Sequence, residues 1–302
     1  MPIVSKTKAI LFYGNYFYGI CAVVLSAEAS LQQGIPLADM WYFSCVFFAT
    51  VYFYSIAYTS EKSPIPHNPR SAWYQSHKLM VQITQLVMFT YLMGCGVFFI
   101  KQYLVTLLVS PTIYLTALIF PVTGAFYYGL DMERLKNFNL RKMGLVKPFI
   151  IGFVWAGIVT VYPVLFDNLE HHLPFYPTLF GNLLFLKNLM FIGLLCIMFD
   201  IKDHVTDSSL HLNTFIVRSG LRTTIFFILI PLCVLGFGTF ITYSLTHHFS
   251  PMKIIINSIP FIALGMVAYS LRKRRPLMYY LTIVDGLMLL KAICGILAFL
   301  CF

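Results

Sequence analysis

The sequence predicts an all-α polytopic membrane protein with about nine transmembrane helices. Hydrophobic residues make up 59% of the 302 residues and charged residues only 11%, whereas a soluble domain is about half apolar and a quarter charged. The apolar residues form continuous runs close to the roughly 20 residues that a helix needs to cross a bilayer. These features exclude a soluble globular protein, a disordered chain, which needs low hydrophobicity, and an outer-membrane barrel, whose strands alternate apolar and polar residues.

Nine apolar segments follow one another along the chain. They cover residues 9–31, 41–58, 79–100, 104–129, 148–166, 179–199, 223–246, 253–271 and 277–302. The fourth contains Pro111 and Pro121, which predict a kink. Ala27-Glu28-Ala29 in the first has the form of a signal-peptidase site, but the apolar stretch exceeds the about 7–15 residues of a signal core. We therefore expect a retained helix and one integral-membrane domain over residues 1–302.

The Lys and Arg residues predict the orientation. With the N-terminus in the cytoplasm, cytoplasmic positions hold all but four of the 21 Lys and Arg. The exceptions are Lys101, Lys187, Lys253 and Lys291. Basic loops mark the cytoplasmic side, so we expect an inner-membrane protein with its N-terminus inside and its C-terminus outside. The net charge of +10 is then explained by loops that contact membrane lipid, without a nucleic-acid partner.

Three of the eleven carboxylates fall in one short stretch at the end of the sixth segment. Asp200, Asp203 and Asp207 form D-x-x-D-x-x-x-D, and a continuous helix would place them within roughly a 60° arc. Like charges on one face repel, and a helix C-terminus disfavours anions. Mg²⁺, which takes carboxylate and phosphate oxygens, would stabilise the group. The alternative is a solvated patch neutralised by nearby cations.

Two stretches resemble the second aspartate-rich motif of the UbiA superfamily of intramembrane prenyltransferases. They are F-D-I-K-D-H-V-T-D at 199–207 and N-T-F-I-V-R-S-G at 213–220, which supplies the Thr and Gly that follow that motif. The basic connection at 140–147 is similar to the one before the family's fifth helix. The resemblance implies a UbiA-like helical bundle around a central cavity. It also implies Mg²⁺-dependent transfer of a polyprenyl group from a prenyl diphosphate to a lipophilic, often aromatic acceptor.

The resemblance assigns roles to particular residues. Asp200, Asp203 and Asp207 would hold Mg²⁺ and form the catalytic motif. The candidate diphosphate contacts are Arg141, Lys142, Arg218 and Arg222.

The family's first aspartate motif is degraded in this chain. One register puts Tyr54, Ser55 and Tyr58 where an Asn and two Asp would stand, which leaves Glu61 as the only carboxylate there. An arginine-bearing stretch, N-P-R-S-A-W at 68–73 with His77 after it, is similar to that of an atypical branch of the superfamily. Three outcomes stay open: one bound ion, a site that uses Glu61, Arg70 and His77 instead, or a non-catalytic protein that binds isoprenoid or other lipid.

Several polar residues lie inside apolar segments, among them Asn15, Asp285 and Lys291. Asn15 could face a substrate cavity, although an interhelical hydrogen bond is the more common role of such a residue. Asp285 and Lys291 are six positions apart, so they do not form a helical i,i+4 pair. A secondary transporter ranks last among the functional alternatives, because we find no inverted repeat and no paired broken helices.

Overall fold

The computed structural model describes residues 6–59, 68–128, 144–209, 214–246 and 248–302, without the side chains of residues 57, 109, 128, 205–209 and 246. Within these ranges the chain is helical and contains no strand. The prediction of an all-α polytopic membrane protein is confirmed.

Each of the nine apolar segments forms helix in the described ranges. In chain order they are α1 (Lys6–Lys8), η1 (Ala9–Tyr13) and α2 (Tyr16–Gln32); α3 (Met40–Thr59); α5 (Lys78–Val109); α6 (Pro111–Tyr128); α7 (Lys147–Ala156), η4 (Gly157–Val161) and α8 (Tyr162–Glu170); α9 (Leu179–Ser209); α11 (Leu221–Thr223), η5 (Thr224–Leu229) and α12 (Ile230–Thr246); α13 (Pro251–Ser270); and α14 (Leu277–Tyr279), η6 (Tyr280–Val284) and α15 (Gly286–Cys301). The short helices α4 (Pro69–Ser76) and α10 (Phe215–Ser219) lie between them.

Six of the helical segments are long and apolar enough to cross a membrane. A seventh is added if Lys6–Tyr13 and Tyr16–Gln32, which are bent by 58°, count as one span. The two remaining segments contain shorter apolar helices, Met40–Ile56 and Pro111–Tyr127. Long apolar helices of this kind satisfy every backbone group internally, as a bilayer requires, so the chain is an integral membrane protein.

The boundary between the third and fourth segments differs from the prediction. The third helix, α5, continues to Val109 and bends at Tyr103, whose φ of −112° and ψ of 18° are not helical. Pro111 begins α6, where a proline needs no amide hydrogen, and Pro121 lies inside it. The apolar composition is continuous across this region, so hydropathy could not place the boundary.

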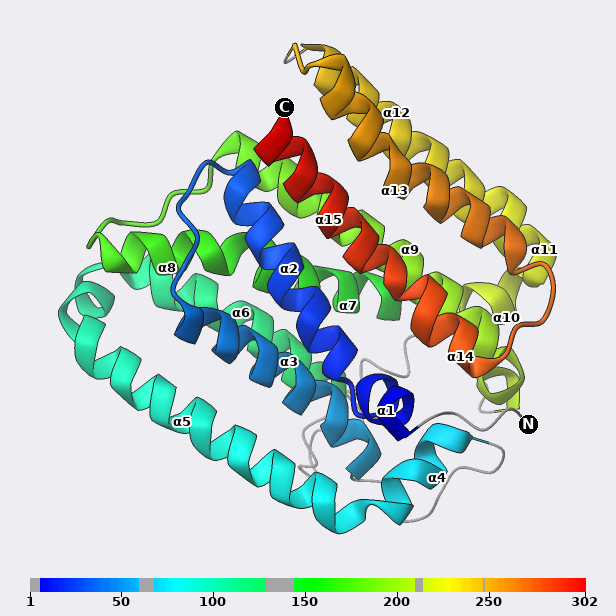
Figure 1. Cartoon of the computed structure of the whole chain (residues 1–302), viewed down its shortest axis with the longest axis horizontal. Helices are drawn as coiled ribbons and strands as arrows, with labels where there is room; N and C mark the ends of the chain where they lie inside the picture. Colours follow the sequence, from blue (N-terminus) through cyan, green and yellow to red (C-terminus); the bar gives the residue numbers. More distant parts are fainter. Residues whose placement is uncertain (1–5, 60–67, 129–143, 210–213, 247) are drawn as a thin grey trace.

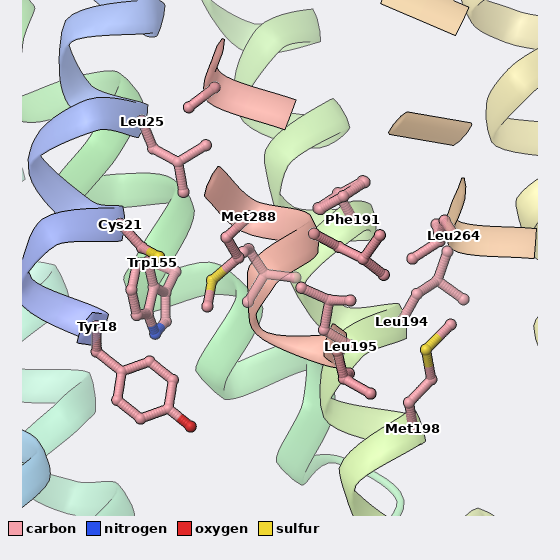
Figure 2. Packing of buried hydrophobic residues seen from close by; sticks show 14 of the residues in the cluster. Tyr18, Cys21, Leu25, Trp155, Phe191, Leu194, Leu195, Met198, Leu264 and Met288 are labelled. Carbon is pink, nitrogen blue, oxygen red and sulfur yellow. The ribbon is translucent and has the colours of Figure 1, made fainter. Parts of the chain in front are cut away.

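The centre of the bundle is formed by α2, α7, α9 and α15 (Figure 1). The long helix α5 lies on one side of them, and the α12–α13 hairpin lies on the other. Figure 2 shows the core between α2 and α9, where Leu25, Leu195 and Met288 pack together with Trp155. The outer helices expose large apolar side chains such as Leu86, as expected for surfaces that face lipid.

The helices α7 and α9 approach each other closely because a glycine lies between their backbones. A Cβ atom on Gly152 would lie 2.7 Å from the carbonyl oxygen of Leu189. Small residues of this kind let membrane helices pack backbone to backbone. The contact fixes the N-terminal end of α7 beside α9, which matters for the site described below.

Candidate functional site

A break at Asn15 separates η1 from α2. Asn15 has a φ of 67°, a left-handed conformation that Asn adopts more readily than most residues. Its side-chain nitrogen donates to the Tyr74 hydroxyl (2.8 Å) and the Ser55 hydroxyl (3.3 Å). Arg70 donates through Nη2 to the Asn15 oxygen and through Nε to the Tyr13 carbonyl (3.2 Å). The interhelical role expected for Asn15 is therefore present, and its role in substrate binding stays a prediction.

Arg70 is positioned by the start of α4. The Asn68 side chain accepts hydrogen bonds from the backbone amides of Arg70 (3.1 Å) and Ser71 (3.3 Å), and Pro69 is the first helical residue. Both features favour a helix start here. The Arg70 side chain is only 5% exposed, and its guanidinium lies 4.5 Å from the centre of the Tyr58 ring.

The neighbours of Arg70 keep it charged. Burial alone would lower the pKa of the guanidinium, but Tyr58, Tyr18, Tyr74 and Asp285 together raise it above its ordinary value. A permanently charged guanidinium in an apolar bundle needs such partners, because isolated buried charge is costly. A fixed positive charge therefore lies at the break before α2.

Asp285 connects this arginine to the last span. Its carboxylate, 3% exposed, accepts a 2.7 Å hydrogen bond from the Tyr18 hydroxyl. The Tyr18 ring stacks on Tyr54 with 4.5 Å between ring centres, and the Tyr54 hydroxyl accepts from the Trp155 indole (2.7 Å). Figure 2 shows Tyr18 and Trp155 side by side. We refer to Asn15, Ser55, Arg70 and Tyr74, joined to Tyr18 and Asp285, as the Asn15 network.

The acidic motif lies on α9 as expected, but lysines from two places bind its first two carboxylates. Asp200 is fully buried, and its Oδ1 accepts from Nζ of Lys147, the first residue of α7, at 2.5 Å. The Asp203 carboxylate is 2.8 Å from Lys202 Nζ and is 40% exposed. Asp207 lies in α9, and its side chain is outside the described residues. The two described aspartates therefore have separate lysine partners.

The acidic motif adjoins the Asn15 network. The Phe199 ring, directly before Asp200, lies 5.7 Å from the Tyr280 ring of η6. Phe199 also packs against the cluster of Tyr13 and Leu281. The end of α9, the break at Asn15 and the start of the last span therefore meet at one end of the bundle.

Other predicted site residues lie at the same end or outside the described ranges. Arg218 and Arg222 are exposed on α10 and α11. Glu61, Arg141 and Lys142 lie outside the described residues.

The Thr and Gly that follow the motif have local structural roles. Thr214 caps α10 by accepting from the Val217 amide, and Gly220 turns the chain into α11 with a φ of 78°.

The described residues do not assemble a metal centre. They contain no group of three His, Cys, Asp or Glu side chains that could hold a metal ion. The positions of the degraded first motif are also occupied: Tyr54 bonds to Trp155, Ser55 bonds within the Asn15 network, and Tyr58 stacks on Tyr74. A Mg²⁺ site with carboxylates on both sides is not formed by these side chains. The Mg²⁺ prediction rests on residues that include Asp207 and Glu61.

Two hollows in the described structure can be compared with the expected central cavity. One of about 20 Å³ lies beside the Asn15 network and is bordered by Gly14, Ser55 and Tyr74. The other, of about 610 Å³, is a shallow groove against α5 between Trp41 and Cys95. Neither is a chamber for a prenyl chain between α2 and α9, so the central cavity stays a prediction.

Several residues of the site were not predicted from the sequence. Lys147 counted only as a basic loop residue, and Tyr18 and Tyr74 carried no distinguishing pattern. Asp285 did carry a signal, because a carboxylate inside an apolar span is usually functional or paired. Lys147 directly precedes an apolar segment, and this position is the signal that could have marked it as a partner for a scarce carboxylate.

No protein-family model matches the chain, and no curated protein matches it in sequence. In fold the chain is similar to a solved structure of a digeranylgeranylglyceryl phosphate synthase in membranes. The two share 16% sequence identity, the TM-score is 0.54, and the match covers 99% of this chain and 100% of that one. At this identity the likeness shows a shared fold over the whole chain.

Proposed function

We propose that this protein transfers a polyprenyl group from a prenyl diphosphate to a lipophilic acceptor, as an atypical UbiA-type enzyme with a degraded first motif. The single observation that carries the proposal is a group of buried ionisable side chains at the end of the bundle that holds the acidic motif. Asp200 with Lys147, and Asp285 with Tyr18 and Arg70, lie where α9, η1 and η6 meet. Ionisable residues at membrane depth are expensive and usually serve a function.

The reaction places simple demands on the site. The bond between C1 and oxygen breaks, its electron pair leaves with the diphosphate, and a carbon or oxygen of the acceptor bonds to C1 and loses a proton. Charge grows on the diphosphate, so cationic donors favour the transition state. Lys147 and Lys202, whose side chains are 20% and 22% exposed, are the described cations best placed to supply them.

Dependence on Mg²⁺ is part of the proposal and rests on the aspartates of α9. Bound Mg²⁺ would neutralise charge on the leaving diphosphate. Asp203 is the most exposed of the described candidates, and Lys202 would have to move away from it. Asp200 is held by Lys147 and acts as a positioning residue in this arrangement. A single ion at Asp203 and Asp207 fits the motif better than a two-centre site.

We further propose that the protein resides in an inner membrane. Its N-terminus and the end of the bundle that holds Asp200 and Arg70 then face the cytoplasm. Loop charge supports this orientation. The soluble diphosphate group would then reach the site from the cytoplasm, and the prenyl tail would lie among the apolar helices.

The test uses the purified full chain in lipid nanodiscs. Labelled prenyl diphosphates of several chain lengths are incubated with aromatic acceptors and with prenylated glyceryl phosphate, with Mg²⁺ or with EDTA. We expect a prenylated product, released diphosphate and loss of turnover in EDTA. The Asp203→Asn variant should lose at least 100-fold, while Asp39→Asn, an exposed carboxylate at the other end of the bundle, should match wild type. Absence of product with every donor refutes the enzyme proposal.

The second candidate is a non-catalytic protein that binds isoprenoid or other lipid on the same fold. The observation that favours it is the first-motif region, where Tyr54, Ser55 and Tyr58 are engaged with neighbouring side chains. Recovery of bound, unconsumed isoprenoid from the purified protein would support this candidate. Rapid turnover would exclude it.

A further inference from the structure

A second cluster of charged side chains lies at the opposite end of α2 from Asn15. Glu28 is 1% exposed and lies one turn before the end of the helix. Its Oε2 is 2.7 Å from Lys291 Nζ of α15, and its Oε1 accepts from Gln32 Nε2 at 2.6 Å. Lys187 of α9 donates to Gln32 Oε1 at 3.0 Å. Three helices therefore bring one carboxylate and two ammonium groups together.

The charges in this cluster do not cancel. Both Glu28 oxygens are engaged by Lys291 and Gln32, and Lys187 Nζ is 4.0 Å from the nearer one. Lys187 makes one short hydrogen bond in the described structure, although an ammonium can donate three. With both lysines protonated, the cluster carries a net charge of +1. Glu28 and Lys291 form a buried salt bridge, in which their charges balance. Among the described residues, the cluster contains no second carboxylate to balance the positive charge of Lys187.

The residues around the cluster leave room for the carboxylate and place further polar groups beside it. A Cβ atom on Gly295 would lie 2.6 Å from Cγ and Oε1 of Glu28, so glycine leaves room for the carboxylate. The π-helical turn η4 frees the Thr160 carbonyl, which accepts from Gln33 at 3.0 Å. Beside Lys187, the Asn188 side chain is 2% exposed, and its Oδ1 is buried without a hydrogen-bond partner in the described structure.

Lys187 is also within reach of the membrane surface. Its side chain is 28% exposed, unlike Glu28 and Lys291. The α9 span of 26 residues is roughly 39 Å long at 1.5 Å per residue, longer than a hydrocarbon core of about 30 Å. Lys187 lies eight residues from the start of α9, roughly 12 Å along its axis. A lysine stem can carry its ammonium from that depth toward the headgroups.

We propose that Lys187 binds the phosphate group of an anionic lipid in the leaflet opposite the Asn15 network. A phosphate oxygen entering from the exposed side would take the unused donors of Lys187 and neutralise the net charge of the cluster. Gln32 and the Glu28–Lys291 pair position the ammonium for this contact. The inference is independent of prenyl transfer, because it concerns the other end of the bundle.

The experiment measures thermal unfolding of the full chain in mild detergent during titration with three additives. They are dioleoylphosphatidylglycerol, dioleoylglycerol, which has the same tails without phosphate, and inorganic phosphate. We expect the phospholipid to raise the unfolding temperature at concentrations at least tenfold below those at which dioleoylglycerol acts. A response to inorganic phosphate as strong as that to the phospholipid also supports the site and identifies the phosphate itself as sufficient.

Matched variants test whether Lys187 is the residue that binds the lipid phosphate. Lys187→Met should raise the half-saturating phospholipid concentration at least tenfold, and Lys187→Arg should keep wild-type behaviour. Lys101→Met removes an exposed lysine of α5 and should have no effect. Equal responses of the wild type to phosphatidylglycerol and dioleoylglycerol overturn the proposal even if Lys187→Met fails to fold. An equal loss in the Lys187→Met and Lys101→Met variants also overturns it.

Discussion

Tyr18 donates a 2.7 Å hydrogen bond to Asp285 across a sequence separation of 267 residues. The bond ties α2, in the first span, to the residue that precedes α15, in the last. Because Tyr18 also stacks on Tyr54 and lies 6.0 Å from the Arg70 guanidinium, one phenol joins the first, second and last spans to α4.

The bond can be removed without removing the ring. Tyr18→Phe should lower the free energy of unfolding by about 1–3 kcal/mol, because it leaves the Asp285 carboxylate buried without its donor. Unfolding in detergent, followed by tryptophan fluorescence, measures the loss. Tyr114→Phe, at a 40% exposed tyrosine, is the control and should change little. A Tyr18→Phe protein as stable as that control would show that Asp285 does not depend on the phenol.

The Lys147–Asp200 pair is suited to a double-mutant cycle. Lys147→Met should destabilise the protein by about 3–5 kcal/mol, because it leaves a buried carboxylate uncompensated. Asp200→Asn in the same chain should restore much of that loss, since the uncompensated charge is then gone. If the two single-variant effects simply add, the pair is not coupled and the contact between Lys147 and Asp200 does not stabilise the protein.

Two glycines at the α7–α9 contact should respond differently to alanine. A methyl group on Gly152 would meet the Leu189 carbonyl at 2.7 Å, whereas one on Gly193 would lie 3.6 Å from the Pro148 carbonyl. Gly152→Ala should cost about 1–3 kcal/mol through overpacking, and Gly193→Ala should be tolerated or slightly stabilising. Thermal unfolding of the two variants in the same detergent makes the comparison. The reverse order would contradict the close approach of α7 and α9.

The left-handed conformation of Asn15 can be separated from its hydrogen bonds. Asn15→Gly keeps the backbone free to adopt a φ of 67° and loses only the side-chain bonds, so its cost is that of the lost bond from Arg70 and the lost bonds to the Tyr74 and Ser55 hydroxyls. Asn15→Ala should be about 1–2 kcal/mol worse, because alanine pays for a left-handed backbone. Denaturant titration of both variants, with the exposed Asn182→Ala as control, measures the difference. Equal stability of the two variants would mean that the break does not need this conformation.

The sequence predicted the elements of this fold well because a bilayer restricts the possible structures. A chain with this many apolar residues must bond every backbone group internally, so each of the nine apolar segments became helical. The boundary between the third and fourth helices was not predicted correctly, because the composition is uniform between Tyr103 and Pro111. The acidic motif on α9 was also visible, because carboxylates are scarce in such a chain.

The sequence could not determine which charged side chains pair with one another. It placed Asp200, Asp203 and Asp207 on one helix and suggested a shared ion. In the described structure, Asp200 instead pairs with Lys147, 53 positions away. Glu28 pairs with Lys291 across 263 positions. Helices that are apolar on every side carry no periodic signal of their orientation. Only the packing of α2, α7, α9 and α15 decides the partners, because a buried charge takes whichever opposite charge the neighbouring helix brings within a few ångströms.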